Sequence, residues 1–379
     1  MQSKKIVITG GHLAPALAVI SELQKRSLPA GRQGDWEIYY LGRKTAMEES
    51  NTSSVESRVI PTLGVEFIPI STGRLQRRFT RYTIPSLLRI PLGFFQALVQ
   101  LRRIKPDVIC SFGGYVSVPV VVVGKLLRIP ILTHEQTVVF GLASKINSFF
   151  ADKVAVSFKE SLAHFPKSKV VLTGNPIREE IFQFQKPSWF QPPVSNFQFR
   201  TIYITGGNQG SSVINSAVLE ILPKLLEKFI VIHQCGDFDY GFVDETTATL
   251  GQRLKERYFL SNFVSHDEIG WVLSSANLII SRAGINTVCE IAILGRPAIF
   301  IPIPWSFQDE QAKNAKMLVE AGIAEILPQS QLSGKTLLEK ISQMMENLEK
   351  YQKNAQKAKS LITLDGGKRL VDEIVSLKR

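Results

Sequence analysis

The sequence has few cysteines and no long hydrophobic run. Cys110, Cys235 and Cys289 are its three cysteines; they lie far apart in apolar surroundings, without metal-ligand spacing. This pattern favours core thiols in a reducing compartment. No stretch approaches the roughly 18 apolar residues of a membrane span. The opening residues, MQSKKIVITGG, lead directly into a strand rather than a signal peptide. We therefore expect a cytoplasmic protein.

Acidic residues are also in short supply. There are 33 Asp and Glu against 45 Lys and Arg, a formal charge of +12, which favours an anionic partner: nucleic acid, phospholipid or a phosphorylated substrate. Residues 74–105 hold seven Arg, one Lys and no acidic residue around the apolar core IPLGFFQALV. This segment is predicted to lie on an anionic membrane surface, the alternative being a core helix with basic ends. No nucleic-acid-reading module is present, so nucleic acid is not expected as a partner.

The length and an internal repeat predict two domains. A chain of 379 residues exceeds one ordinary core, and two domains of roughly 150 to 200 residues are the default. KKIVITGG (4–11) returns as RTIYITGG (200–207), each a strand and glycine turn before a helical segment. Residues 106–136 and 276–304 both read as strand, glycine loop, helix and strand. Two doubly wound α/β domains in tandem follow.

Three further segments complete this organisation. Gly, Pro and aromatic residues interrupt the periodicity over 173–199, where the join is expected. LPAGRQG (28–34) reads as an inserted surface loop. The helical segment from about Leu332 onward is rich in Lys, Glu and Gln and is expected to cross back onto the first domain.

Both glycine turns suit an anion, because glycine lets backbone N–H groups approach it at the start of a helix. The first turn, Gly-Gly-His, lacks the G-x-G-x-x-G pattern, and the following strand ends in Gly42-Arg43 rather than in an acidic residue. A nicotinamide or flavin enzyme is therefore disfavoured.

The second half carries polar residues suited to a nucleotide sugar. In SRAGINTVCE, Glu290 lies about one turn into a helix, where its carboxylate could accept both ribose hydroxyls; a solvated helix residue is the alternative. In WSFQDEQAKNA (305–315), Asp309, Gln311 and Asn314 follow a strand, and amides suit sugar hydroxyls.

The first half carries candidates for proton transfer. SFGGYVS and THEQTVVFGLASK supply Tyr115, His134, Glu135 and Gln136 at strand ends. His134 comes just after an apolar strand and fits a structural role. His12 differs, because a glycine turn exposes it at the start of a helix.

An ordered set of motifs covers nearly the whole chain. They are TGGHLAPALAV, SFGGYVSVPV, ILTHEQ, GNPIR, GGNQGS, SRAGINTVCEIAILGRPAIFIPIP and DEQAKNAKMLVEAGIA. In order and spacing the set resembles the MurG-type glycosyltransferases of bacterial cell-wall synthesis. The resemblance implies a GT-B fold, α/β, in which two doubly wound Rossmann-like parallel-sheet domains face a central cleft. It assigns an acceptor and membrane-associating domain to 1–174, with a C-terminal helix (about 360–379) packing back on it, and a UDP-N-acetylglucosamine domain to 175–359.

The resemblance also implies a reaction. N-acetylglucosamine would pass from UDP-N-acetylglucosamine to the C4 hydroxyl of the muramyl sugar of undecaprenyl-linked lipid I, with inversion, giving lipid II. No cofactor or metal is expected. The implied location is the cytoplasmic face of the cell membrane, as a peripheral protein. An anionic membrane surface and other cell-wall synthesis proteins are the further expected partners.

Roles carry over position by position. His12 would be the general base, with Glu135 in reserve. Glu290 would hold the ribose and Val264 would lie near the uracil. Arg178 and Asn208 would face the diphosphate. The other implied substrate-binding residues are Thr9, Gly10, Gly11, Tyr115, Thr137, Ile285, Asn286, Thr287, Val288, Gln311 and Asn314.

The chain departs from the family pattern at several positions. The family's first loop is usually of G-G-T-G-G-H type, so the loop before His12 is shortened here. Thr137 replaces the family's Asn, Ala143 to Lys145 read ASK instead of TNK, and Asn208 replaces a Ser. The alternatives are a GT-B transferase for another lipid such as a diacylglycerol, a UDP-N-acetylglucosamine epimerase, and a nucleotide-sugar-binding protein without catalysis.

Overall fold

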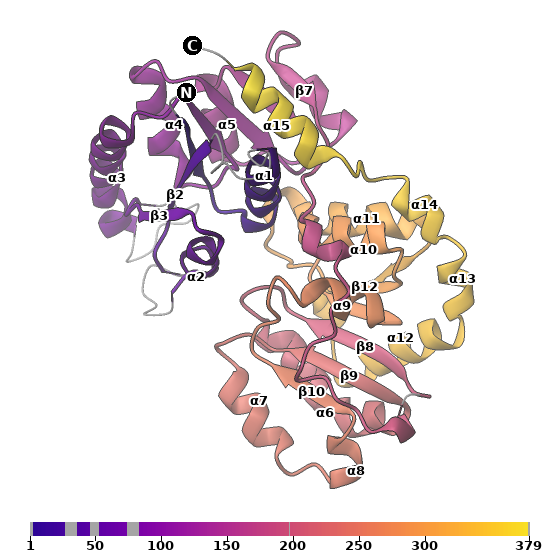
Figure 1. Cartoon of the computed structure of the whole chain (residues 1–379). Coiled ribbons are helices and arrows are strands. Elements are labelled where there is room, and N and C mark those ends of the chain that lie inside the picture. The colour runs from indigo at the N-terminus through magenta and orange to yellow at the C-terminus, as the bar shows by residue number, and fades with distance from the viewer. Residues whose placement is uncertain (1–2, 27–35, 46–52, 74–82, 197, 378–379) are drawn as a thin grey trace. The chain divides into compact units, whose positions relative to one another are not determined.

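The computed structural model describes residues 3–26, 36–45, 53–73, 83–196 and 198–377. The chain forms two units, one of residues 1–178 with 363–379 and one of residues 179–362 (Figure 1). The predicted insertion 28–34, and Arg77 and Arg78 of the basic stretch, lie outside the described residues.

The first unit is built on a seven-stranded sheet in the order β3-β2-β1-β4-β5-β6-β7, and all of its neighbouring strands pair in parallel. Its strands are β1 (Lys4–Thr9), β2 (Trp36–Gly42), β3 (Glu66–Pro69), β4 (Val108–Ser111), β5 (Ile131–Glu135), β6 (Lys153–Val156) and β7 (Val170–Leu172). Its helices are α1 (Leu13–Arg26), α2 (Val55–Val59), α3 (Thr83–Ile104), α4 (Ser117–Leu126), α5 (Leu142–Phe150) and α15 (Gly366–Ser376). Helices cover both faces, which is why Ile6, Val7 and Ile8 are all fully buried although their side chains alternate.

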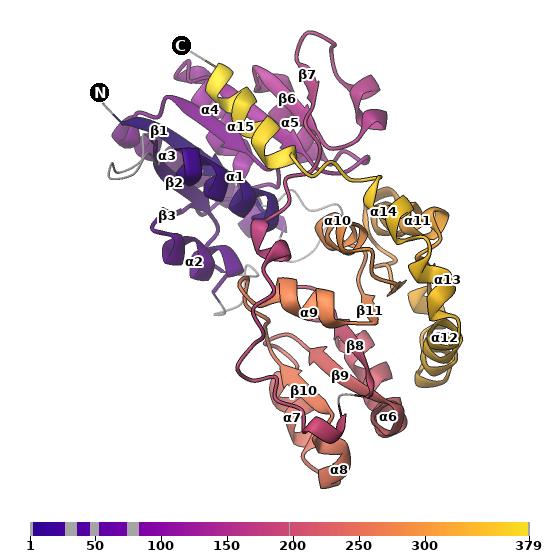
Figure 2. The same cartoon turned by 45° about the vertical axis from the view of Figure 1, so that its right-hand side comes forward.

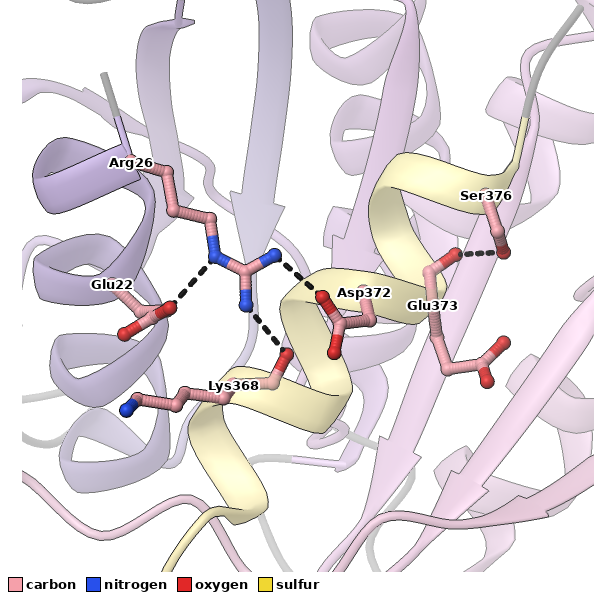
Figure 3. A network of polar contacts seen from close by, with 6 residues as sticks. All are labelled: Glu22, Arg26, Lys368, Asp372, Glu373 and Ser376. Carbon is pink, nitrogen blue, oxygen red and sulfur yellow. Dashed lines mark hydrogen bonds and ion pairs between the residues drawn. The ribbon is translucent and has the colours of Figure 1, made fainter. Parts of the chain in front are cut away.

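The last helix, α15, lies beside α1 in both views (Figure 2). Leu370, Val371 and Ile374 enter the core that α1 forms with the sheet. Arg26 fixes the pair from the surface (Figure 3): its guanidinium donates to Glu22 at 2.7 Å, to Asp372 at 2.6 Å and to the Lys368 carbonyl at 3.1 Å. The chain end is thus part of the first unit.

The second unit has a six-stranded parallel sheet in the order β10-β9-β8-β11-β12-β13. Its strands are β8 (Arg200–Thr205), β9 (Phe229–Gln234), β10 (Tyr258–Ser261), β11 (Leu278–Ser281), β12 (Ala298–Phe300) and β13 (Ala324–Ile326). Its helices are α6 (Ser212–Lys228), α7 (Tyr240–Thr247), α8 (Gln252–Lys255), α9 (Ile269–Ser275), α10 (Ile285–Leu294), α11 (Glu310–Ala321), α12 (Gly334–Glu346), α13 (Leu348–Gln352) and α14 (Ala355–Lys359). One core joins α6 and α12 to the sheet.

Each sheet reverses its strand order at the place where the repeated motifs meet. In the first unit β1 pairs with β4, and Thr9 lies opposite Ser111. In the second unit β8 pairs with β11, and Thr205 lies opposite Ser281. Ligands of open α/β sheets bind at the carboxyl ends of the strands at such a switch point. The repeat therefore places two glycine loops at corresponding sites.

Helix α3 carries the described part of the basic stretch. Ala97, Leu101 and Ile104 pack into the core of the first unit. The opposite face is apolar but exposed; its residues are Ile84, Leu88, Leu92, Phe95 and Val99. A core face and an exposed apolar face thus coexist on one helix. Among the described residues, no helix is both long enough and apolar enough to cross a bilayer.

Candidate active site

The first glycine loop is packed tightly against the loop that follows β4. Gly10 has φ +143°, and a Cβ there would lie 2.9 Å from the Phe112 carbonyl carbon, so only glycine fits. The Gly10 carbonyl accepts from the Tyr40 hydroxyl at 2.9 Å, and the Thr9 hydroxyl donates to the Leu41 carbonyl at 2.8 Å. The Thr9 hydroxyl and the Gly10 carbonyl thus form their hydrogen bonds within the unit.

The next backbone amide of the shortened loop, that of Gly11, is also hydrogen-bonded. The Gly11 N–H donates to the Gly113 carbonyl at 3.2 Å, so this amide joins the two switch-point loops. His12 follows at the exposed surface, one residue before α1. The shortened loop therefore presents the His12 imidazole at the start of α1.

The His12 imidazole is a neutral base at pH 7. Desolvation by the surrounding protein, and then the Arg43 cation, lower its pKa below the ordinary value. Its side chain is nevertheless exposed, so solvent moderates the loss of hydration. The exposed, neutral imidazole can accept a proton from an approaching hydroxyl, and the lowered pKa makes it a weaker base than an ordinary histidine.

The segment after β5 is stabilised from within. Glu135 is buried, and its Oε1 accepts from both the backbone N–H and the hydroxyl of Thr137 at 3.1 Å. Burial raises the pKa of this carboxyl, and hydrogen bonds from Ser144 and Thr137 oppose the shift. The Thr137 hydroxyl also lies 2.7 Å from the Val139 carbonyl. Glu135 and Thr137 thus hold the turn together.

His134 and Tyr115 occupy the same end of the sheet. His134 is buried, with Nε2 3.2 Å from the Gly174 carbonyl. Burial lowers its pKa to about 4, against the opposing effect of that carbonyl. It is therefore a neutral side chain that connects β5 to the segment after β7. Tyr115 is half-buried in the loop after β4.

The second glycine loop is a compact turn before α6. The Gly207 N–H donates to the Thr205 hydroxyl at 3.0 Å, and the Gly210 N–H donates to the Gly207 carbonyl at 3.0 Å. A Cβ on Gly206 would lie 2.3 Å from the Ser211 nitrogen, so the turn closes only with glycine. Asn208 is exposed at its tip.

A buried arginine that sequence reasoning missed lies beneath this loop. Arg282 donates to the Ser211 hydroxyl at 2.8 Å and to the Ile301 carbonyl at 2.9 Å. Ser211 precedes α6, but its side chain does not cap that helix. Burial lowers the pKa of the guanidinium, which stays charged at pH 7. A buried cation held by neutral groups favours an anion nearby.

An Asp-x-Asp pair after β9 was also missed. Asp239 accepts from the Ser212 hydroxyl at 2.9 Å and from the Asn215 amide at 2.6 Å, and Asp237 accepts from Asn262 at 2.7 Å. The sequence pattern was visible, but these contacts make Asp239 a brace for the start of α6 and join Asp237 to the segment after β10. In the part of the chain that the structure describes, no three His, Cys, Asp or Glu side chains group as metal ligands.

Two amides of α11 reach the loop after β11. The Gln311 Oε1 accepts from the Ala283 N–H at 3.3 Å and the Ile303 N–H at 3.1 Å. Asn314 is 1% exposed and donates to the Ala283 carbonyl at 3.1 Å. Asn314 therefore lies beneath the loop rather than pointing toward its mouth. In Gln311, the two hydrogen bonds to the oxygen fix the orientation of the side-chain amide and so of its NH₂ group. Asp309, which precedes α11, has φ +56°.

The remaining predicted residues lie mainly on α10. Ile285 begins the helix, Asn286 and Thr287 are half-buried in its first turn, and Val288 is buried. Glu290 is only 4% exposed, so the alternative of a solvated carboxylate is wrong.

Two further predicted residues lie outside α10. Val264 is buried after β10, and Arg178 ends the first unit.

Both units match models of one protein family. Residues 8–156 match the glycosyltransferase family 28 N-terminal domain, and residues 201–370 match the glycosyltransferase family 28 C-terminal domain. The chain belongs to glycosyltransferase family 28. The sequence-based predictions of a glycosyltransferase and of two Rossmann-like domains of GT-B type are thereby confirmed.

Individual proteins similar to this chain identify the type of glycosyltransferase within the family. A Bacillus cereus protein named UDP-N-acetylglucosamine–N-acetylmuramyl-(pentapeptide) pyrophosphoryl-undecaprenol N-acetylglucosamine transferase 2 is 35% identical, over 92% of this chain and 93% of its own. The crystal structure of Acinetobacter baumannii MurG is 25% identical with a TM-score of 0.65, covering 98% of this chain and 99% of that one. The MurG-type resemblance is therefore confirmed.

An epimerase shares the fold at lower identity. A Neisseria meningitidis UDP-GlcNAc 2-epimerase, crystallised with UDP-GlcNAc, has a TM-score of 0.65 at 15% identity, over 98% of this chain and 100% of that one. At this identity the likeness shows a shared fold alone.

Proposed function

We propose that this protein transfers N-acetylglucosamine from UDP-N-acetylglucosamine to the muramyl sugar of an undecaprenyl-pyrophosphoryl acceptor. The observation that carries the proposal is the 35% identity over 92% of the chain to a relative named for this transfer. The described sites agree with it: a polar nucleotide-sugar site in one unit and a neutral histidine on a glycine loop in the other.

The donor site is assigned to the second unit. Glu290 would accept the ribose hydroxyls and Val264 would lie beside the uracil. The loop around Asn208 would take the diphosphate at the start of α6, supported by the charge of Arg282. A positive environment stabilises the UDP leaving group as its charge grows. Gln311 would donate to a hydroxyl of the sugar.

The acceptor site is assigned to the loops after β1, β4 and β5. His12 would take the proton of the C4 hydroxyl while that oxygen attacks the anomeric carbon from the face opposite UDP. The new glycosidic bond forms as the bond to the diphosphate breaks, so the configuration inverts and UDP leaves as the anion. Glu135 and Thr137 would position the loop, and Tyr115 would contact the acceptor.

The acceptor chemistry implies a peripheral protein at the cytoplasmic face of the cell membrane. A polyprenyl chain remains in the bilayer, so the enzyme has to approach it there. The exposed apolar face of α3 and the adjoining basic residues support contact with an anionic surface. The proposed role is a step of peptidoglycan synthesis, and through it of cell shape and division.

The transfer can be tested with purified protein, UDP-N-acetylglucosamine and the lipid-linked muramyl acceptor. We expect free UDP and a disaccharide lipid in equal amounts. Transfer of N-acetylglucosamine to a diacylglycerol instead, with release of UDP, would identify a different acceptor, and a manno-configured UDP-sugar product would indicate an epimerase.

The base is tested in the same assay. His12→Ala should lower kcat by at least about 100-fold, the usual contribution of a positioned base, while leaving UDP affinity within about twofold, since one unit alone holds the nucleotide. Full turnover of this variant would remove His12 as the base.

A further inference from the structure

A buried glutamine connects two segments of the second unit. Gln234 ends β9 and is 4% exposed. Its Oε1 accepts from the Tyr203 hydroxyl at 2.9 Å and from the Val264 N–H at 3.3 Å, and its Nε2 donates to the Gly207 carbonyl at 3.1 Å. Because a hydroxyl and an amide surround the oxygen and a carbonyl faces the nitrogen, the side-chain amide has one orientation.

This orientation determines the direction of a loop amide. The Gly207 carbonyl is held inward by Gln234 and by the Gly210 N–H at 3.0 Å. The peptide bond that follows is trans, so the N–H of Asn208 points opposite to that carbonyl. Asn208 is exposed, and the left-handed Gly207, with φ +86°, allows this arrangement. An outward N–H beside a helix start is a donor for a phosphate oxygen.

We propose that Gln234 is a positioning residue that orients the backbone N–H of Asn208 toward the diphosphate. The same side chain fixes the Val264 segment that contacts the uracil. This inference rests on the proposed function, because it takes UDP as the nucleotide. A single rigid amide holds both segments in place before the nucleotide arrives, so binding does not have to order them. Removing it weakens the contribution of the diphosphate beyond any general loss of stability.

The test compares uridine with UDP by calorimetry. The measured quantity is the Kd of uridine divided by the Kd of UDP, and this ratio isolates the contribution of the diphosphate. In Gln234→Met, which has no group to donate to the Gly207 carbonyl, we expect this ratio to fall on the order of tenfold, equivalent to one well-made hydrogen bond. Tyr203→Phe is the matched control: it removes one hydrogen bond to Gln234 but neither contact to the loops, so its ratio should stay within about twofold of the wild type.

A purely structural glutamine would lower the melting temperature and leave the ratio unchanged, and that outcome overturns the proposal. If the methionine variant does not fold, Gln234→Glu decides. Its new carboxyl donates to the Gly207 carbonyl when protonated and repels it when ionised, so the ratio, relative to the wild type, should fall about tenfold from pH 6 to pH 9. Equal ratios overturn the proposal. Failure of the wild type to bind UDP more tightly than uridine would instead contradict the proposed function.

Discussion

Gln311 illustrates how the backbone determines what a side chain can recognise. Two N–H groups, of Ala283 and Ile303, point at its oxygen, so its NH₂ group is the part left to face a ligand. A site arranged in this way donates to sugar oxygens and does not accept from sugar hydroxyls. The two backbone contacts of the Gln311 oxygen thus determine which groups of a ligand this side chain can bind.

Gln311→Glu should therefore retain the two backbone contacts and lose the donor. We expect kcat/KM for UDP-N-acetylglucosamine to fall on the order of tenfold or more, because a carboxylate meets a sugar oxygen without a proton. UDP affinity should remain within about threefold. Gln331→Glu, at an exposed position of the same unit, is the control for the added charge. Equal losses in both variants would contradict the assignment.

Sequence reasoning at this scale identified polar positions but not their direction. Asn314, Thr137 and Thr9 were named as contacts of the substrate, and in the structure their side chains hydrogen-bond within their own unit. A buried brace and a ligand group are both polar residues at strand ends, so spacing does not separate them. Gln234 and Arg282 were missed for the same reason, because their role depends on loops distant in sequence.

Elements were far easier to predict than contacts. The helical segment expected after RTIYITGG is α6, Ser212–Lys228, and the strand expected to end at Gly42-Arg43 is β2, Trp36–Gly42. Parallel strands buried on both faces read as short apolar runs, and glycine marks their ends. In α3 the pattern was ambiguous, because both faces of that helix are apolar.

The exposed face of α3 leads to a prediction about membranes. Leu88 and Phe95 are 74% and 64% exposed, and burying each in a bilayer contributes about 1.5 to 3 kcal/mol. Changing both to Glu should weaken sedimentation with anionic phospholipid vesicles at least tenfold, without altering UDP affinity.

The control for this prediction changes Phe242 and Phe238 to Glu. Both are exposed aromatic residues of the second unit, and the pair adds the same charge. An equal loss of vesicle binding in the two double variants would show that net charge, rather than the α3 face, governs attachment.

At the scale of the whole molecule, the second unit is an insertion into the first. Two chain crossings join them, after Arg178 and after Ile362. The internal repeat predicted two α/β units because each opens with the same strand and glycine turn. The sequence pattern placed the join only within 173–199, because the exact points of crossing depend on which helices share a core.

This division predicts where a nucleotide stabilises the protein. UDP at 100 times its Kd should add about 2.7 kcal/mol to the unit that binds it. Hydrogen exchange should slow in β8, β9, β11 and α10, while the sheet of residues 4–172 changes little. Comparable protection of both sheets would contradict donor binding by the second unit alone.

The return of α15 to α1 sets an order of events during synthesis. The ribosome produces most of the first unit, then the entire second unit, and only at the end the helix that completes the first core. Throughout translation of residues 179–362, the apolar surface of α1 that receives Leu370, Val371 and Ile374 has no cover. The unit that begins first is therefore finished last, and a nascent chain that stalls before residue 366 would carry a complete second unit and an incomplete, aggregation-prone first unit.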